Sequence, residues 1–376
     1  MMVLIAGIIG TDFAPSVNLA TLPIALVIVG VAISTLPTGK LMGRHGRRVV
    51  FIGYGLLAIV GGLLASLSLV YHSFLAFCGA ALVIGWAAAA GHQYRFAALE
   101  SVAPELSHKA TSVLLMGGIL GAFVGPELAV RGRYLLHTEY AGSYLLLAAA
   151  YVLGLVIVSQ FRDHQHVRQV EAVKGRPLRI ILAAPQLQVA VAAAALGYAV
   201  MSFIMTATPI SMHNHSGHSL EATKVVIQSH IAAMYLPSLL FGWFFARLGF
   251  RGMFWIGTLI YLFCLAVALW DTHLLNYWVS LVLLGIGWNF LFLAGTNLLP
   301  HGYQPEERFR VQSMNDFLVF SVQAIVALSS GWFLAQMSWR GLLLSCVPLL
   351  IVFIVILWLR GGALATRPLT ASIPPD

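Results

Sequence analysis

The stretch Gly39-Lys40-Leu41-Met42-Gly43-Arg44-His45-Gly46-Arg47-Arg48 decides the fold that we predict for this chain. It is a strongly basic segment between two apolar runs, at about 19–37 and 49–71. A helix needs about 20 mainly apolar residues to cross a hydrocarbon core of roughly 30 Å, and both runs have that length. The stretch is therefore predicted to be a tight turn between two membrane-spanning helices.

Apolar residues dominate the whole chain, because 60% of its residues are hydrophobic and only 9% are charged. Soluble domains carry roughly a quarter charged residues, so a soluble protein is excluded. Similar apolar runs recur to the end of the sequence, without the alternating pattern of a transmembrane barrel. We predict an all-α polytopic membrane protein embedded in the lipid bilayer.

The longest hydrophilic stretch, Arg162 to Arg179, divides the chain into two halves. Six apolar runs follow it and five or six precede it, because the first, Met1 to about Phe13, has half the length of a span. Either this first helix is short and truncated, or its true start lies upstream. The predicted domains are an N-terminal helical half at 1–161, a cytoplasmic linker at 162–186, a C-terminal helical half at 187–362 and a loose tail at 363–376.

Basic residues gather in alternate loops, which predicts the orientation in the membrane. If the linker is cytoplasmic, the opposite side holds only Arg131, Arg133, Lys224 and Arg340. An excess of lysine and arginine is typical of cytoplasmic loops. We therefore expect a multi-pass protein of a bacterial cytoplasmic membrane. The net charge of +8 follows from these loops, so nucleic acid is not an expected partner.

A weak internal repeat relates the two halves. The pattern Gly39-x-Leu41-x-Gly43-Arg44-x-Gly46-Arg47 is echoed by Gly242-x-x-x-x-Arg247-Leu248-Gly249-x-Arg251. Two six-helix halves with this turn resemble the major facilitator superfamily over the whole chain. The resemblance implies alternating access, in which the halves rock around a site near the membrane midplane. It also implies a conformational turn formed by Gly39, Gly43, Arg44, Gly46 and Arg47, although the family usually has an acidic residue where this chain has Gly43.

Two pairs of soft metal-ligand residues stand on consecutive spans of the second half. Met201 and Met205 are four residues apart, as are His230 and Met234, so each pair lies on one helix face. With a rise of about 1.5 Å per residue, the pairs are predicted at matching depths on neighbouring antiparallel helices. Thioethers and imidazole suit Cu(I), which makes these residues a candidate metal site. The alternative is that they are packing residues, since methionine commonly fills cores.

The segment Met212-His213-Asn214-His215-Ser216-Gly217-His218 joins these two spans on the predicted outer face. Met212, His213, His215 and His218 could capture copper or zinc there before it passes inward. The alternative is a polar connection that happens to be rich in histidine.

A closer resemblance is carried by Met201-Ser-Phe-Ile-Met205 and His230-Ile-Ala-Ala-Met234, which look like motifs of the CcoA-like (CalT) copper importer branch of the superfamily. Asn18 to Pro23, Tyr94 to Ala98 and Asn315 to Phe317 resemble its framework segments. The resemblance implies that the four ligand residues bind copper as a transported substrate, with no resident cofactor, and that the copper supplies haem-copper cytochrome oxidase assembly. Cytoplasmic copper chaperones are further candidate partners, and we expect a monomer. Relatives in this branch carry other cargo, riboflavin among them.

Four further polar residues in or near the spans have two interpretations each. Glu127 and Asp316 could take part in proton coupling, or they could be carboxylates at helix ends that pair with an arginine. His92 and Arg95 fall on one helix face, and we interpret them as a structural link to the facing half or to loop acids rather than as substrate contacts.

The predicted function is import of copper by alternating access. No catalytic constellation and no phosphate-binding glycine loop occur in the sequence, so neither an enzyme nor an ATP-driven pump is expected. The alternative is a transporter of a small organic molecule such as a flavin or drug, which aromatic density at Trp288, Phe290 and Phe292 would favour. A copper sensor or oxidase-assembly partner that does not transport is a third class, for which the chain lacks a sizeable soluble domain.

Overall fold

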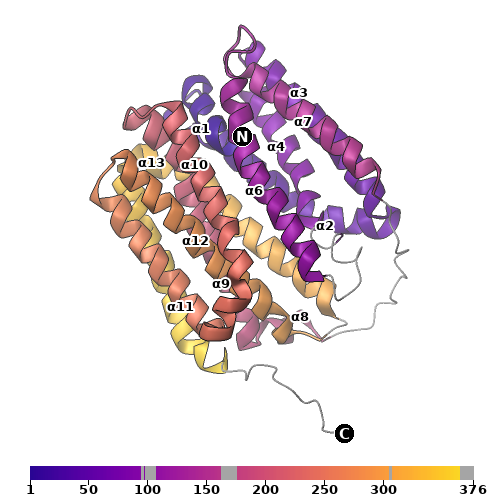
Figure 1. Ribbon diagram of the computed structural model, residues 1–376, viewed down its shortest axis with the longest axis vertical. Helices are drawn as coiled ribbons and strands as arrows, with labels where there is room; N and C mark the ends of the chain where they lie inside the picture. The colour runs from indigo at the N-terminus through magenta and orange to yellow at the C-terminus, as the bar shows by residue number, and fades with distance from the viewer. Residues whose placement is uncertain (95–96, 98–106, 162–175, 305–306, 365–376) are drawn as a thin grey trace.

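The computed structural model describes residues 1–94, 97, 107–161, 176–304 and 307–364, which form helices joined by short connections (Figure 1). Among these residues, eight helices are long and apolar enough to cross a membrane by length and composition. Within the described ranges no residue is in a strand. The predicted all-α fold is confirmed.

The first half is a series of helices with two short turns. The helices are α1 (Met2–Phe13), α2 (Leu22–His45), α3 (Arg47–Val70), α4 (Phe74–Ala88), α6 (Ser107–Arg131) and α7 (Ala141–Ser159), and the turns are η1 (Val17–Leu19) and η2 (Gly91–Gln93). Helix α1 is as short as the sequence predicts, yet Leu4 to Gly10 are all buried. These residues are buried because α1 packs against α2 and α9, so they contact protein rather than lipid.

The second half follows the same plan. Its elements are α8 (Leu178–Leu182), α9 (Pro185–Ile210), the π-turn η4 (Ser211–His215), α10 (Leu220–Tyr235), η5 (Leu236–Leu240), α11 (Phe241–Trp270), α12 (Leu274–Leu298), η6 (Leu299–Gly302), α13 (Arg308–Arg360) and η8 (Gly361–Leu364). Helices α11 and α13 each join two spans at one residue with non-helical backbone angles, Gly249 in α11 and Ser338 in α13. The first part of α11 completes the span that α10 begins.

The basic turn is tighter than the sequence predicts. Helix α2 runs on through Gly39 and Gly43 to His45, and α3 starts at Arg47, so the chain turns at Gly46 alone. Gly46 has a φ of 78°, and Gly249, its counterpart in the repeat, has a φ of 57°. Residues with a side chain rarely adopt these values. The two halves therefore use the same kind of turn at the position that the repeat indicates.

Two predicted spans each contain a short 3-10 turn. In the span predicted at 74–99, α4 ends at Ala88 and the 3-10 turn η2 follows, where Gly91 is a poor helix former; residues 95–96 and 98–99 lie outside the described ranges. The span predicted at 223–246 changes to the 3-10 turn η5, because Pro237 has no N–H to continue the α-helical hydrogen bonds. In both places a local backbone preference overrides the apolar run.

The two halves meet mainly along three helix pairs. Helix α13 packs against α2, α1 against α9, and α6 against α10, which run side by side near the centre of Figure 1. Helices α6 and α9 both end at one end of the bundle (Figure 1). We call it the outer end, in accordance with the predicted orientation. Helix α8 lies toward the opposite, inner end (Figure 1).

Candidate functional site

The four predicted metal ligands are all buried in the second half. Met201 and Met205 on α9 are 7% and 5% exposed, and His230 and Met234 on α10 are 0% and 9% exposed. Helix α12 packs against both α9 and α10, whereas these two helices touch each other little. The sequence predicts that the Met201/Met205 and His230/Met234 pairs stand on neighbouring helices, but α9 and α10 do not pack closely against each other. Which helices meet is decided by contacts between non-consecutive segments.

His230 points toward α12. Its Nδ1 lies 2.7 Å from the carbonyl oxygen of Leu281, and because a carbonyl only accepts, Nδ1–H is the donor. Nε2 then carries a lone pair, and it is buried without a hydrogen-bond partner. Asn289 Nδ2 donates to the carbonyl oxygen of Met234 at 2.7 Å, which ties α10 to α12 beside the histidine. A histidine fixed in this way resembles a metal ligand, whose second ring nitrogen usually donates to a carbonyl or carboxylate.

The histidine-rich segment at the outer end of α9 is braced by hydrogen bonds. His213 Nδ1 lies 2.9 Å from the carbonyl oxygen of His218, and His218 Nε2 lies 2.9 Å from that of Thr272. Met212 is 0% exposed. In the part of the chain that the structure describes, no three His, Cys, Asp or Glu side chains gather to hold a metal ion. His213, His215 and His218 therefore form no metal-capture cluster in this structure.

Four aromatic side chains gather near the middle of the second half's helices. They are Tyr198 on α9, Trp288 and Phe292 on α12, and Phe320 on α13. The Trp288 and Phe292 rings are stacked with centroids 4.7 Å apart. Tyr198 meets Trp288, Phe292 and Phe320 edge to face at 5.1, 5.2 and 5.7 Å. Both geometries are favourable for aromatic pairs, so we call these four residues the aromatic cluster.

The aromatic cluster reaches the first half through Phe320. This ring is buried together with Val31 and Ala32 of α2, and its centroid lies 4.8 Å from the imidazole of His92 in η2. The cluster therefore lies at the junction of the two halves, where their relative movement would change its surroundings.

Two residues of α12 show how its faces differ. Trp288 is 4% exposed, and its Nε1 is buried without a hydrogen-bond partner. Phe290, two residues further, turns to α11 and meets Phe244 at 5.1 Å, because positions two apart on a helix face different sides. Of the three aromatic residues that the sequence singles out here, Trp288 and Phe292 join the cluster, whereas Phe290 packs elsewhere.

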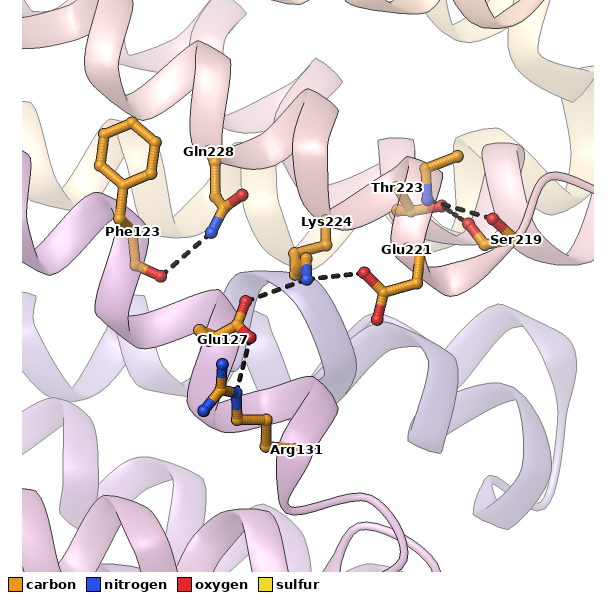
Figure 2. A network of polar contacts seen from close by, with 9 residues as sticks. Phe123, Glu127, Arg131, Ser219, Glu221, Thr223, Lys224 and Gln228 are labelled. Carbon is orange, nitrogen blue, oxygen red and sulfur yellow. Dashed lines mark hydrogen bonds and ion pairs between the residues drawn. The ribbon is translucent and has the colours of Figure 1, made fainter.

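Glu127 joins the halves by ion pairs at the outer end (Figure 2). Its Oε2 lies 2.9 Å from Lys224 Nζ on α10, and its Oε1 lies 2.7 Å from Arg131 Nε on α6. Lys224 also pairs with Glu221 at 2.6 Å, within α10. Arg131 is thus a partner of Glu127, and Lys224 extends the contact to the other half.

Three uncharged contacts connect the halves at the same end. They are Gln228 Nε2 to Phe123 O at 3.0 Å, Asn214 Nδ2 to Thr11 Oγ1 at 3.1 Å, and Gln336 Nε2 to Asn18 Oδ1 at 3.3 Å. Each joins a first-half residue to a second-half residue. Asn214 and Gln336 lie next to an outer helix end, and Gln228 lies about two turns into α10 from its outer end. The structure is therefore held closed at the outer end.

Asp316 and Arg47 lie toward the inner end. Asp316 accepts a hydrogen bond of 3.1 Å from Asn315 Nδ2 on α13, and Arg95 lies outside the described residues. Arg47, the last residue of the conformational turn, donates from Nη1 to Gln93 O at 3.4 Å. A cation beside the carbonyls that end a helix is favourable, so Arg47 stabilises the junction of α3 with η2.

Three residues of these contacts, Tyr198, Phe320 and Lys224, are not among the predicted site residues. Tyr198 and Phe320 are each one of several aromatic residues in an apolar span, and only the fold shows that they face one another. Lys224 has a clearer signal, because it stands just inside the start of a span, where a cation needs a partner.

Comparison with known proteins agrees with this architecture. The family model described as the Major Facilitator Superfamily matches residues 1–308. The riboflavin transporter RfnT of Brucella anthropi is 32% identical over 363 residues, covering 96% of this chain and 91% of that protein. The uncharacterized MFS-type transporter YdeG of Bacillus subtilis is 31% identical over 371 residues, covering 94% of this chain and 85% of that protein.

A solved structure shows the same fold. The crystal structure of a bacterial homologue of the human lysosomal transporter Spinster, in an inward-facing and occupied conformation, matches with a TM-score of 0.71 and 14% identity. The match covers 98% of this chain and 94% of that one. Its identity is too low to indicate more than the fold. With the family model and the relatives, it shows that this chain is a multi-pass membrane transporter, not an enzyme, and that it belongs to the major facilitator superfamily.

Proposed function

We propose that the protein carries a small planar organic molecule of the flavin class across the membrane. The observation that carries this proposal is the aromatic cluster at the junction of the halves. Ligand sites are mostly apolar and aromatic, with few polar groups, and transporters of this architecture bind substrate between their repeats near the midplane. The similarity to the riboflavin transporter RfnT over nearly the whole chain supports the same substrate class.

The contacts at the outer end support a cycle of alternating access. Substrate can enter from outside only after the Glu127–Lys224 pair and the three uncharged contacts separate. Closing them again while the inner end opens would release the substrate on the linker side. In a bacterial cytoplasmic membrane with a cytoplasmic linker, this cycle is import.

Uptake of labelled riboflavin by cells that need external riboflavin tests the proposal. Expression of the chain should raise uptake above that of vector-only cells. Tyr198→Ala and Phe320→Ala should lower it at equal expression, whereas Phe263→Ala, at a 58% exposed position on α11, should not. Uptake that stays at the vector level with the wild-type chain would refute a riboflavin substrate.

Copper import for cytochrome oxidase assembly is the second candidate, and His230 favours it. A buried imidazole with a fixed tautomer and a free lone pair suits a soft metal ion. Met234, four residues further on the same helix, adds a thioether on the same face. Met201 and Met205 would have to come from α9, which packs against α12 rather than closely against α10.

Copper accumulation in a copper-limited strain separates the two candidates. Copper import predicts loss of accumulation in Met201→Leu and His230→Leu at equal expression, because leucine keeps the volume but cannot bind the metal. Unchanged copper accumulation in both variants would rule out a copper site at these residues. Inhibition of riboflavin uptake by copper chelators would instead argue against the flavin proposal.

A further inference from the structure

Trp288 is the only residue of the aromatic cluster whose polar atom is both buried and unpaired in the described part of the chain. Its side chain is almost fully covered, at 4% exposure, so water does not satisfy Nε1. Buried polar groups in folded proteins nearly always have a hydrogen-bond partner, and the exceptions need a physical reason. A ligand that supplies the partner is such a reason at the centre of a transporter.

Phe292 covers one face of the indole, and Tyr198 lies beside this stack, with its ring centroid 5.1 Å from Trp288 and 5.2 Å from Phe292. Phe292 stacks on the ring with an interplanar angle of 15°, and Tyr198 meets it at 88°. The N–H edge carries the one polar atom of the indole, and this atom has no hydrogen-bond partner among the residues that the structure describes. Indole Nε1–H donates and cannot accept, so its partner must be an acceptor.

We propose that Trp288 determines specificity by donating its Nε1–H to a carbonyl oxygen or unprotonated ring nitrogen on the edge of the planar substrate. The inference rests on the proposed flavin-class function. Tyr198, which lies beside the Trp288–Phe292 stack, and Phe320, which meets Tyr198, are the rings against which the substrate would lie. A flat solute without an acceptor on its edge would leave the N–H unpaired and bind more weakly.

Binding to the purified full-length chain in lipid nanodiscs tests this assignment. Quenching of riboflavin fluorescence gives the dissociation constant for the wild type, Trp288→Phe and Trp332→Phe. Phenylalanine keeps an aromatic ring but removes the donor, so Trp288→Phe should weaken binding by about tenfold. Trp332 is 48% exposed on α13 and serves as the matched control, so Trp332→Phe should bind like the wild type.

A second replacement keeps the test valid if Trp288→Phe does not fold. Trp288 replaced by benzothienylalanine has nearly the shape of tryptophan with sulfur in place of N–H, so it should fold and show the same loss. Riboflavin binding that is equal in the wild type and this variant would overturn the role of Trp288 and leave the flavin function standing. Absence of riboflavin binding by the wild type would overturn both.

Discussion

Lys224 Nζ on α10 lies 2.9 Å from Glu127 Oε2 on α6, so an ion pair connects the second half of the transporter to the first. The lysine side chain is 12% exposed and the carboxylate 35% exposed, which places the pair at the rim of the interface. Partly exposed pairs contribute little stability on their own. This pair matters because it must separate whenever the outer end opens.

We predict that reversing one charge of this pair loosens the outer end. Glu127→Lys and Lys224→Glu each put like charges opposite one another, and the double variant restores attraction. Disulfide formation between Thr11→Cys and Asn214→Cys measures closure, because these side chains form a hydrogen bond of 3.1 Å in the closed structure. Cross-linking should slow roughly twofold to fivefold in each single variant and recover in the double variant.

Two controls sharpen this measurement. The native cysteines Cys78, Cys264 and Cys346 are all buried, so they should not cross-link with the introduced pair. Glu221→Gln removes the other ion pair of Lys224, which lies within α10 and does not join the halves. It should cross-link at the unmodified rate, and the same slowing in Glu221→Gln and the charge reversals would contradict a specific role for Glu127.

The architecture could be predicted from the sequence because its signals are local. Apolar runs of membrane length indicate the spans, and the equivalent turns at Gly46 and Gly249 follow from a repeat of glycine and arginine. The short 3-10 turns within two of the spans also have local causes, at Gly91 and Pro237. At both places the length of the apolar run predicts an uninterrupted helix, although a glycine or a proline within the run disfavours the α-helix.

The candidate site was less predictable because it depends on contacts between distant segments. Periodicity places Met201 with Met205, and His230 with Met234, but it cannot show that α12 packs against both helices. The aromatic cluster combines residues from three helices, and only the two on α12 were singled out. Even there, Phe290 and Phe292 look alike in the sequence, and the helical rotation between them decides which one joins the cluster.

We predict that Phe292→Leu impairs riboflavin uptake and that Phe290→Leu does not. Phe292 stacks on Trp288, so its loss frees the indole and disturbs the aromatic cluster. Phe290 packs against Phe244 on α11, so its loss should lower the melting temperature without changing the apparent KM. Initial rates at several riboflavin concentrations, with the melting temperature of each purified variant, separate the two effects. A raised KM in Phe290→Leu alone would show that the cluster is wrongly placed.

We predict that alanine at either turn glycine destabilises the transporter. Gly46 and Gly249 combine positive φ with ψ values of 160° and −178°, a region that is essentially confined to glycine and where a Cβ atom costs about 1–3 kcal/mol. Gly39 lies in regular helix α2, where a Cβ atom added to it would meet no other atom within 4 Å, so Gly39→Ala should be neutral or stabilising by about 0.5–1 kcal/mol. Thermal unfolding in one detergent ranks the variants. Equal melting temperatures for Gly39→Ala and Gly46→Ala would contradict the turn geometry.

Arg176, in the predicted linker at 162–186, forms an ion pair with Glu307 at the start of α13. Arg176 Nη2 lies 2.8 Å from Glu307 Oε2, and the backbone N–H of Gln304 donates to the same oxygen at 2.9 Å. The hydrogen bond from Arg176, and to a smaller extent that from Gln304, lowers the pKa of Glu307 from 4.5 to about 2. The pair should therefore persist at mildly acidic pH.

We predict that this pair contributes the same stability at pH 8 and pH 5. Because the folded pKa lies below the unfolded value, the contribution is fully present above about 4.5 and is lost as the pH falls toward about 2. Glu307→Gln should lower the melting temperature by the same amount at pH 8 and pH 5, since the wild-type carboxylate is ionised at both. Arg179→Gln, which removes a cation of the same linker for which no pairing with Glu307 is observed, is the control. A difference between wild type and Glu307→Gln that disappears already at pH 5 would show that the carboxylate is not held by Arg176 in solution.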